Sequence, residues 1–422
     1  MEARQVAAED QIVDIAGTGA LDADAPSAAT GCERRLLQET IGGYVMNIAG
    51  LEVFVLRAPD TDRPHWVSHF SVASANEILV RMRTSEGVEG FGLATSYASA
   101  EPIIQAFRSG IGEQIIGMDP LAPERLHEAL LSLTSQRLAH EKGWGREVLI
   151  RIAAAVDIAC WDIIGKMAGL PLHRLLGGYR NRVPCYVTCA YYRDGKDLVE
   201  LHDEMQKLKG QGHTGFKAKV GGVTLAEDMK RLEVVRDVIG SDNDLMIDAN
   251  RAWDLATATE AIGLLEPLKP RWLEEPVRWA DDRRELKLLS QRTRIPLSAG
   301  ESELTAYGCR ALLEEQAIQI LQFDCTMFGG FTEGRKLAAM CELNHVQVAP
   351  HHDCFIHAPL VASTPAGCIV ESFTDPERDP LQAELFENPP NIAKGWVTLN
   401  DAPGLGLTLA DPALRKFGER VL

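Results

Sequence analysis

Seven polar residues close short apolar stretches of the chain at a nearly regular interval, and three of them are consecutive carboxylates. Successive members stand 20 to 29 residues apart. A strand, a loop and a helix together take about 30 residues. This spacing is what a (β/α) barrel produces when each strand offers a group at its C-terminal end, where such barrels hold their chemistry. The seven are Lys219, Asp248, Glu274, Glu301, Asp324, His351 and Glu371.

The three carboxylates, Asp248, Glu274 and Glu301, predict a site for a divalent cation. Carboxylates that converge at the mouth of a barrel repel one another unless a positive charge neutralises them. A ligand set made only of oxygen selects a hard cation, most simply Mg²⁺. Any one of these residues alone is more commonly a loop residue, a helix N-cap or half of a salt bridge. Their occurrence on successive strands favours the metal site.

Two lysines, Lys217 and Lys219, precede the carboxylates in the run Gly-Phe-Lys-Ala-Lys-Val. Strand alternation places both side chains on one face, toward the barrel axis, and the apolar residues between them on the other. Two ammonium groups this close, beside a dication, disfavour each other's charge. We therefore expect a lysine pKa lowered toward the range of a general base. The alternative is a solvent-facing strand end, which is common for lysine.

Beyond the carboxylates, Asp324 ends the run Ile-Leu-Gln-Phe and His351 follows Val-Ala-Pro. Adjacent barrel strands would let the aspartate hold one imidazole nitrogen and leave the other for proton transfer. His351 is preferred to the neighbouring His352 because of the strand register and of the family resemblance described below. Zinc is not indicated, since no partner cluster has the spacing of a zinc site. Glu371, near a bound carboxylate, would be pushed toward its neutral form and could donate a hydrogen bond.

The elements that must position these residues follow from the periodicity of the chain. Residues 1–45 lack strand periodicity and are interpreted as a tail. In 46–180, strand-like segments with Gly-containing turns precede helical ones, which predicts an α+β domain. In 181–385, eight short apolar strands alternate with helices, and eight strands close a parallel barrel. The segment 386–422 is expected to pack back on the first domain.

Composition excludes several classes of partner. The 422 residues are 45% hydrophobic and carry a net charge of −17 without a Lys/Arg-rich run, so nucleic acid and anionic membrane are poor partners. A bound cation could still attract an anionic substrate. Nine scattered cysteines without a C-x-x-C pair favour reduced thiols and a cytoplasmic location. No signal peptide and no membrane span are expected from the sequence.

Taken in order, these motifs resemble the enolase superfamily, in particular its mandelate racemase-like group. The resemblance covers the chain from about residue 46 onward, and it is carried by Lys-Ala-Lys, Asp-Ala-Asn, Glu-Glu-Pro, Ala-Gly-Glu, a strand-terminal Asp, Ala-Pro-His and Val-Glu-Ser. Each motif alone is weakly specific, whereas the combination in this order is highly specific. The resemblance implies a TIM-like (β/α)₇β barrel capped by the N-terminal α+β domain, which the C-terminal segment completes.

The resemblance also implies roles in removing a proton from the carbon next to a carboxylate, through an enediolate. Mg²⁺ would be held by the three carboxylates. Lys219 would be the base on one face, and the Asp324–His351 dyad would act on the other. A homo-oligomer that acts on a small carboxylate is expected. In the supporting roles, Lys217 would tune Lys219 and contact the substrate carboxylate, Asn250 would lie in the inner shell, Glu371 would stabilise the enediolate, and His65 and Tyr97 of the capping loops would contact the substrate.

Bases on both faces leave two reactions open. If His351 protonates a β-hydroxyl leaving group, the enzyme is a hydro-lyase of carbohydrate acid catabolism that dehydrates a sugar acid to a 2-keto-3-deoxy acid. If the second base returns a proton to the opposite face, it is a racemase or epimerase. Dehydration is favoured, because such members are common in this group and the capping loop is polar. A Schiff-base aldolase using Lys217 or Lys219 would not need three carboxylates, and a non-catalytic binding protein would not need all seven groups.

Overall fold

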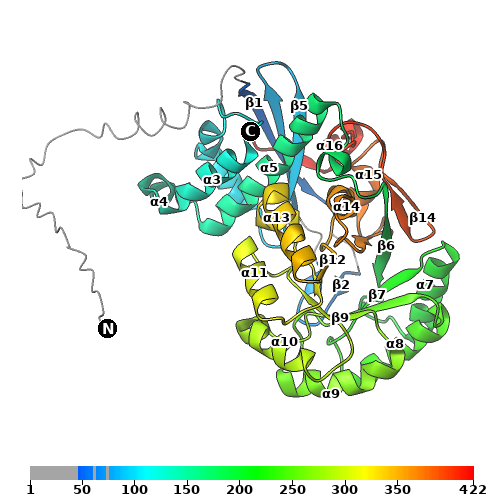
Figure 1. Ribbon diagram of the computed structural model, residues 1–422. Coiled ribbons are helices and arrows are strands. Elements are labelled where there is room, and N and C mark those ends of the chain that lie inside the picture. Colours follow the sequence, from blue (N-terminus) through cyan, green and yellow to red (C-terminus); the bar gives the residue numbers. More distant parts are fainter. Residues whose placement is uncertain (1–45, 60–62, 73–75) are drawn as a thin grey trace, which may run out of the picture. The chain divides into compact units, whose positions relative to one another are not determined.

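The computed structural model describes residues 46–59, 63–72 and 76–422. The predicted tail, residues 1–45, lies outside the described residues. The chain from residue 46 onward forms one compact unit, in which a small sheet with helices, here called the cap, precedes a barrel (Figure 1).

The cap is built on a four-stranded antiparallel sheet whose last strand comes from the far end of the sequence. Its strand order is β16-β1-β4-β5. The alternation of apolar and polar residues in these strands buries one face under the cap helices. The strands are β1 (Ile48–Arg57), β4 (Asn76–Thr84), β5 (Glu89–Ser96) and β16 (Gly418–Arg420), and the helices are α2 (Glu101–Arg108), α3 (Pro123–Ser132), α4 (Arg137–Lys142) and α5 (Arg146–Ala168).

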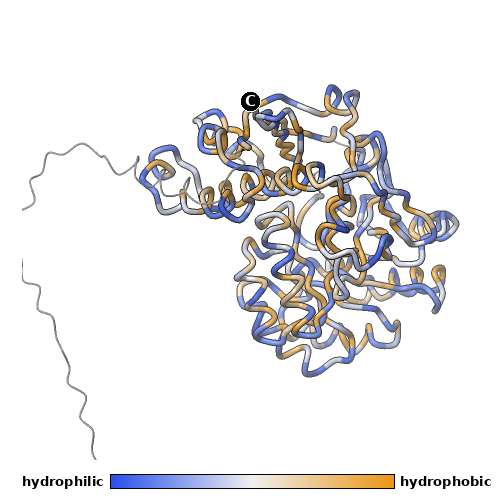
Figure 2. Tube along the Cα trace, turned by 45° about the horizontal axis from the view of Figure 1, so that its top comes forward, coloured by the Kyte–Doolittle hydropathy of each residue, from blue (hydrophilic) through white to orange (hydrophobic). Residues whose placement is uncertain are grey.

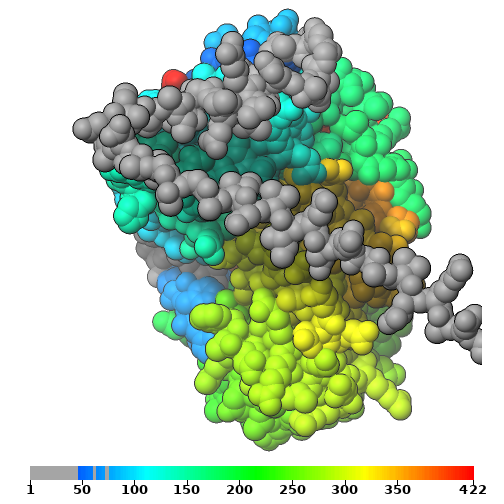
Figure 3. Space-filling view, turned by 60° about the vertical axis from the view of Figure 1, so that its left-hand side comes forward, coloured from blue at the N-terminus to red at the C-terminus, as the bar shows by residue number. Residues whose placement is uncertain are grey.

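Helix α5 approaches β5 closely because two residues of the strand lack a side chain. A Cβ atom on Gly92 would lie 2.0 Å from the carbonyl oxygen of Ala155, and one on Gly90 would lie 2.7 Å from that of Ala159. The same helix packs against α12 (Cys325–Phe328) and α13 (Gly330–Leu343) of the barrel. In the space-filling view, the teal cap helices border the darker yellow barrel helices along this face (Figure 3). Helix α5 thus joins the cap sheet to one side of the barrel.

The barrel contains eight parallel strands with helices between them, as the resemblance implies. The strands run in the order β6 to β12, and β13 pairs with β6. Apolar and polar positions alternate along the outer helices (Figure 2). The strands are β6 (Arg182–Cys189), β7 (Gly215–Lys219), β8 (Asp244–Asp248), β9 (Trp272–Glu274), β10 (Leu297–Ala299), β11 (Ile320–Leu321), β12 (Gln347–Val348) and β13 (Val370–Ser372). The helices are α7 (Leu198–Gly210), α8 (Leu225–Ile239), α9 (Leu255–Leu265), α10 (Asp282–Ser290), α11 (Ala306–Glu314), α12 (Cys325–Phe328), α13 (Gly330–Leu343) and α14 (Cys354–Ser363).

Closure of the barrel is incomplete between β12 and β13. No ladder joins these two strands in the described part of the chain, and they meet through one parallel bridge between Val348 and Gly367. Backbone hydrogen bonds support the bridge, since Val348 N donates to Ala366 O and Cys368 N donates to Val348 O. Short strands leave this seam with few hydrogen bonds, while β13 pairs with β6 on its other side.

An apolar layer fills the barrel below the polar strand ends. Six buried residues form a separate cluster inside the barrel, and each stands two positions before a polar residue of the mouth. Because strand side chains alternate, residues two apart point to the same side. A TIM-like barrel is packed in such layers. The pairs are Tyr186 and Thr188, Met246 and Asp248, Trp272 and Glu274, Ile320 and Gln322, Ala349 and His351, and Ile369 and Glu371.

The C-terminal segment returns to both parts of the molecule. Strand β15 pairs with β6 of the barrel, and β16 pairs with β1 of the cap. A two-stranded hairpin, β2 with β3, extends from the cap sequence toward the barrel and meets Tyr192 through backbone hydrogen bonds of Trp66. The elements are β2 (His65–Trp66), β3 (Ser71–Val72), α15 (Pro380–Glu384), β14 (Asn391–Ala393), β15 (Trp396–Thr398) and α16 (Asp411–Phe417).

Two further expectations concern thiols and membranes. The eight cysteines within the described ranges are all free thiols, which agrees with the expectation from their spacing. Among the helices of the described ranges, none combines the length and the apolar character that a membrane crossing requires.

Candidate active site

Three of the predicted residues are direct neighbours across adjacent strands. Lys219 pairs with Asp248 between β7 and β8, and Asp248 pairs with Glu274 between β8 and β9. Glu301 follows β10 by two residues. Because these strands are parallel and end together, the side chains meet at one edge of the barrel.

The carboxylates of Asp248, Glu274 and Glu301 form a cluster that fits a divalent cation. One oxygen of each lies within 4.8 Å of the other two. Glu301 Oε2 is buried and has no hydrogen-bond partner within the described ranges, although His351 Nε2 lies 3.4 Å away. The Oδ1 atom of Asn250, which is also buried, likewise has no partner there. Unpartnered oxygens beside a carboxylate triad are the donor set of a hard cation.

Neighbouring groups hold two of these carboxylates in place. Trp272 Nε1 donates to Glu274 Oε2 at 3.1 Å, and Gln322 Nε2 donates to the same oxygen at 2.7 Å. The backbone nitrogen of Asn250 donates to Asp248 Oδ1 at 2.8 Å. Hydrogen bonds thus orient both carboxylates, as the outer partners of metal ligands do.

The backbone leaves these strand ends in a conformation that side chains disfavour. Non-glycine residues with positive φ lie two and three positions after Asp248, directly after Glu274, and one and two positions after His351. Each such non-glycine residue costs about 1 to 3 kcal/mol and is typical of functional sites. The residues and their φ angles are Asn250 (42°), Arg251 (63°), Glu275 (38°), His352 (56°) and Asp353 (21°).

Both lysines face the carboxylates, as the alternation predicts. Lys219 Nζ lies 2.5 Å from Asp248 Oδ2. Lys217 Nζ lies 2.9 Å from Glu274 Oε1, 2.7 Å from Glu371 Oε1 and 3.4 Å from Asp248 Oδ2, and its side chain is fully buried. One buried ammonium group therefore bridges three carboxylates.

The expected lowering of the lysine pKa is wrong for this arrangement. Burial and the Lys217 charge favour a lower pKa for Lys219, but the adjoining Asp248 outweighs them and the pKa is raised. Lys217 also has a raised pKa, because Glu274 and Glu371 outweigh its burial. The prediction counted the two ammonium groups but not how closely the strand register brings the carboxylates to them.

The pKa values of Asp248 and Glu274 are shifted by the same neighbouring charges. Although burial opposes it, the ammonium groups of Lys219 and Lys217 hold the pKa of Asp248 at about 2. Burial and the neighbouring charge of Asp248 raise the pKa of Glu274 to about 8. A carboxylate that binds a proton this readily lacks sufficient positive charge around it, which a cation would supply.

The Asp324–His351 dyad is present in the structure. His351 Nδ1 lies 3.2 Å from Asp324 Oδ2, and His351 Nε2 faces Glu301. Burial opposes protonation of the imidazole, but Glu301 and Asp324 raise the pKa of His351 to about 9. Asp324 also caps α12, since its Oδ1 accepts from Thr326 N at 2.8 Å. The hydrogen bond to the N-terminus of α12 holds the Asp324 carboxylate in place, and this carboxylate orients the His351 ring.

The structure brings His351, and not His352, to the aspartate. The ring of His352 lies 4.9 Å from that of Phe373, and its backbone nitrogen donates to Glu371 Oε2 at 2.8 Å. Burial and the neighbouring His351 lower the pKa of His352 to about 3. This imidazole is therefore a neutral part of the wall.

Glu371 differs from the expectation of a neutral carboxyl group. Burial raises its pKa, but the charges of Lys217 and His351 outweigh burial and hold the pKa well below its usual range. The hydroxyl of Thr188 donates to its Oε1, and His352 N donates to its Oε2. Glu371 is thus an ionised acceptor that holds Lys217 and the loop after β12 in place.

The predicted substrate residues lie at the rim, with different partners. The Tyr97 ring lies 5.9 Å from those of His351 and His352. The His65 ring lies 5.7 Å from Tyr191, whose ring centroid is 5.5 Å from Lys219 Nζ. Tyr97 thus lies beside His351, whereas His65 lies beside Tyr191, which in turn neighbours Lys219.

Three side chains at the barrel mouth were not predicted from the sequence. Arg378 stacks over the rings of Tyr191 and Phe373, at 4.2 and 4.6 Å, so a cation and two aromatic rings line the wall beside Lys219. Thr188 and Gln322 stand two residues after apolar members of the barrel layer, and this alternation could have revealed them. Arg378 lies in a loop without periodicity, and no local pattern singles it out.

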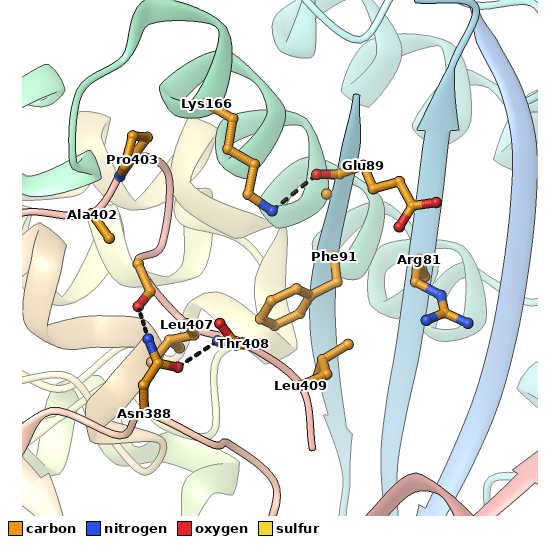
Figure 4. Close-up of a pocket in the computed structure, with 12 residues that line it drawn as sticks. Arg81, Glu89, Phe91, Lys166, Asn388, Ala402, Pro403, Leu407, Thr408 and Leu409 are labelled. Atoms are coloured by element: carbon orange, nitrogen blue, oxygen red, sulfur yellow. Dashed lines mark hydrogen bonds between the residues drawn. The ribbon is translucent and has the colours of Figure 1, made fainter. Parts of the chain in front are cut away.

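A separate cavity of about 340 Å³ lies between the cap and the C-terminal segment (Figure 4). Lys166 borders it with its ammonium group bonded to Asp162 and to the carbonyl oxygen of Glu89. Asn388 bonds Gly406 and Thr408 across the opposite wall. None of the predicted site residues lines it.

Two family profiles match the chain. Residues 50–177 match the mandelate racemase/muconate lactonizing enzyme N-terminal domain, and residues 200–413 match the enolase C-terminal domain-like family. The first range contains β4, β5, most of β1 and the cap helices, and the second runs from within α7 through the rest of the barrel and ends before β16.

Characterised relatives align with most of this chain at moderate sequence identity. Arabinonate dehydratase of Saccharolobus solfataricus is 27% identical over 349 residues, which is 81% of this chain and 90% of that protein. L-talarate/galactarate dehydratase of Salmonella typhimurium is 30% identical over 351 residues, which is 81% of this chain and 84% of that protein. A hydrophobic dipeptide epimerase of Enterococcus faecalis is 27% identical over 353 residues, which is 80% of this chain and 93% of that protein.

Solved structures resemble the fold over most of the chain. A mandelate racemase/muconate lactonizing enzyme from a marine actinobacterium, in complex with magnesium, is 32% identical with a TM-score of 0.79, covering 89% of this chain and 99% of that one. L-talarate dehydratase from a Polaromonas species, complexed with Mg and L-glucarate, is 27% identical with a TM-score of 0.77, covering 89% and 98%. The (β/α)₇β barrel with its cap is therefore a fold shared with these proteins.

Proposed function

Because this chain belongs to the mandelate racemase/muconate lactonizing enzyme family, we propose that it is a Mg²⁺-dependent enzyme that removes the proton next to a carboxylate. The observation that carries the proposal is the row of Asp248, Glu274 and Glu301, with Lys219 at one end and His351 at the other. A base at each end of a cation site can serve the two faces of one substrate carbon.

The three carboxylates would hold Mg²⁺, which supplies positive charge beside the substrate carboxylate when it is bound. Lys219, as the neutral amine, would accept the α-proton. His351, as the imidazolium held by Asp324, would deliver a proton on the other side. Because Asp248 and Glu301 now raise the pKa of these two bases, a cation that draws on the same carboxylates would bring the lysine closer to its neutral form.

Dehydration of a sugar acid is the reaction we favour. His351 as an imidazolium can protonate a departing β-hydroxyl group, and the relatives include arabinonate and L-talarate/galactarate dehydratases. Epimerisation is the second candidate, favoured by the presence of bases at both ends of the row and by the dipeptide epimerase relative.

Other assignments complete the proposal. The cap would comprise residues 46–180, the barrel 181–385 and the completing segment 386–422. A homo-oligomer and a cytoplasmic location stay predictions from the sequence. For the substrate, Lys217 and Asn250 would contact the carboxylate, Glu371 would hold Lys217 in place and act on the enediolate through it, and His65 and Tyr97 would contact the remaining hydroxyl groups.

A screen of mono- and diacid sugars would test the proposal. We expect a 2-keto product from one of these acids in the presence of MgCl₂, no product after treatment with EDTA, and full recovery when Mg²⁺ is returned. Deuterium uptake from D₂O without product would replace dehydration by epimerisation. Turnover that EDTA leaves unchanged would contradict the metal assignment.

A further inference from the structure

A line of four hydrogen-bonded side chains connects Asp324 to the cap sheet. Thr326 Oγ1 lies 2.6 Å from Asp324 Oδ1 and 2.9 Å from Thr95 Oγ1. Thr95 Oγ1 lies 3.0 and 3.1 Å from the two oxygens of Glu77. Glu77 and Thr95 face each other across β4 and β5, and all four residues are buried. The line therefore runs from the barrel mouth into the cap without a solvent-exposed member.

The number of protons in this line identifies the state of Glu77. Three oxygen–oxygen contacts at hydrogen-bond distance need three protons, because two facing lone pairs repel. The two threonine hydroxyls supply one proton each. The third must come from Asp324 or Glu77, the carboxyl groups at the two ends.

Of these two carboxyl groups, Asp324 is the ionised one. Its Oδ2 faces His351, and its Oδ1 already accepts from Thr326 N. Although burial opposes it, the hydrogen bond to His351 holds the pKa of Asp324 below its usual range. His357 Nε2 accepts from Cys325 N and Nδ1 faces the carbonyl oxygen of His352, so this ring has no proton to give Asp324.

The surroundings of Glu77 favour its neutral form. Its side chain is buried, with a relative exposure of 6% for the residue. Burial raises its pKa well above the usual range, and the charges of Asp353 and Asp324 act in the same direction, against the hydrogen bond with Thr95 and the charge of Arg151. The guanidinium group of Arg151 is held elsewhere, since it donates to the carbonyl oxygen of Thr95 at 2.5 Å and to Glu147 at 3.3 Å.

We propose that Glu77 is a positioning residue of the dyad, a neutral carboxylic acid that donates to Thr95, which donates to Thr326, which donates to Asp324. The role in catalysis rests on the proposed function of the dyad, whereas the protonation of Glu77 does not. The line keeps Asp324 Oδ1 occupied, so that Oδ2 alone orients His351. It also keeps a second negative charge away from an aspartate that must stabilise an imidazolium.

Infrared difference spectroscopy on the full-length protein at neutral pH tests the protonation directly. The spectrum of the wild type minus that of Glu77→Gln should contain the C=O band of a protonated carboxyl group and no carboxylate band. A carboxylate pair of bands in the difference would overturn the proposal. This outcome needs no substrate, so it is distinguishable from failure of the proposed reaction.

Kinetics with the identified substrate test the positioning role. Glu77→Gln keeps a donor of the same size, so kcat should stay within about threefold of the wild type. Glu77→Leu removes the donor, and kcat should fall about tenfold with KM unchanged, the usual effect of one lost hydrogen bond. Lys219-dependent deuterium exchange should be unchanged in both variants. Equal kcat in Glu77→Leu and the wild type, or equal loss in both variants, would contradict the role.

Discussion

The lysine end and the histidine end of the carboxylate row meet the cap in different ways. Near the lysine end, the β2–β3 hairpin makes two contacts to the loop after β8: Ser68 Oγ donates to the carbonyl oxygen of Asn250 at 3.0 Å, and His69 Nε2 lies 3.0 Å from that of Arg251. The second of these is exposed to solvent. At the histidine end, the contacts come from the interior of the cap.

Those interior contacts are buried on both sides. Thr326 bonds Thr95 of β5, and Thr332 N donates to Asp157 of α5 at 3.0 Å. Buried hydrogen bonds are lost only at a high cost in free energy, whereas contacts of a surface hairpin open readily. The comparison suggests that the dyad depends on an intact cap core, while Lys219 depends mainly on the strand register of the barrel.

The largest expected effect separates the two bases. Lys219→Ala should abolish both deuterium exchange and product, because the α-proton has no acceptor. His351→Asn should abolish product but retain exchange, because the lysine still removes the proton. We expect losses of about 10³-fold, within the range of general acid–base catalysis. Exchange by NMR in D₂O and product release measure the two steps.

The assignment of the bases would be wrong if either variant kept full turnover. Unchanged circular dichroism and unfolding midpoints serve as the control for folding. If His351→Asn lost exchange and Lys219→Ala kept it, the roles of the two ends would be reversed.

The next effect concerns stability at the lysine end. Lys217→Met leaves Asp248, Glu274 and Glu371 buried without their shared ammonium group. Removing one partner of a buried ion pair costs about 3 to 5 kcal/mol, so the urea midpoint should fall sharply in EDTA. MgCl₂ should recover part of the lost stability, since Mg²⁺ would return positive charge to Asp248 and Glu274.

Lys287→Met is the matched control. Its ion pair with Glu315, at 2.8 Å, is about half exposed on both sides, so we expect little change in the urea midpoint, because solvent screens such a pair. Equal destabilisation by both substitutions would contradict the bridging role of Lys217.

The smallest expected effect concerns pH at the histidine end. Burial raises the pKa of Asp157 to about 7. Because this exceeds the unfolded value, the stabilisation is complete at acid pH and is lost as the pH rises through about 7. Asp157→Asn does not titrate, so its stability relative to the wild type should rise by about 2 kcal/mol between about pH 5.5 and 7. Urea unfolding across this interval measures it.

An Asp237→Asn variant, which changes an exposed carboxylate, should stay within about 0.5 kcal/mol of the wild type throughout. A flat pH dependence for Asp157→Asn relative to the wild type would show that Asp157 is ionised in the folded protein.

Local alternation accounts for what could be predicted. The ladder of strand ends and the shared face of Lys217 and Lys219 depend on neighbours within a few residues, and the barrel and its convergent carboxylates follow from them. The pKa directions of Lys219 and Glu371 depend on distances between strands, which spacing along the chain does not provide. The link from Thr326 to Thr95 joins residues 231 positions apart, and no periodicity connects them.

Strand β16 gives the molecule a particular order of assembly. It pairs with β1 through Phe54, Val55 and Leu56, and Arg57 bonds Glu419, a residue 362 positions later in the chain. During synthesis at about 5 to 20 residues per second, β1 leaves the ribosome long before its partner. The edge of the cap sheet at β1 therefore stays unpaired until the whole barrel has been synthesised. A ribosome-bound chain stalled before β16 should expose that edge to proteolysis or to chaperones.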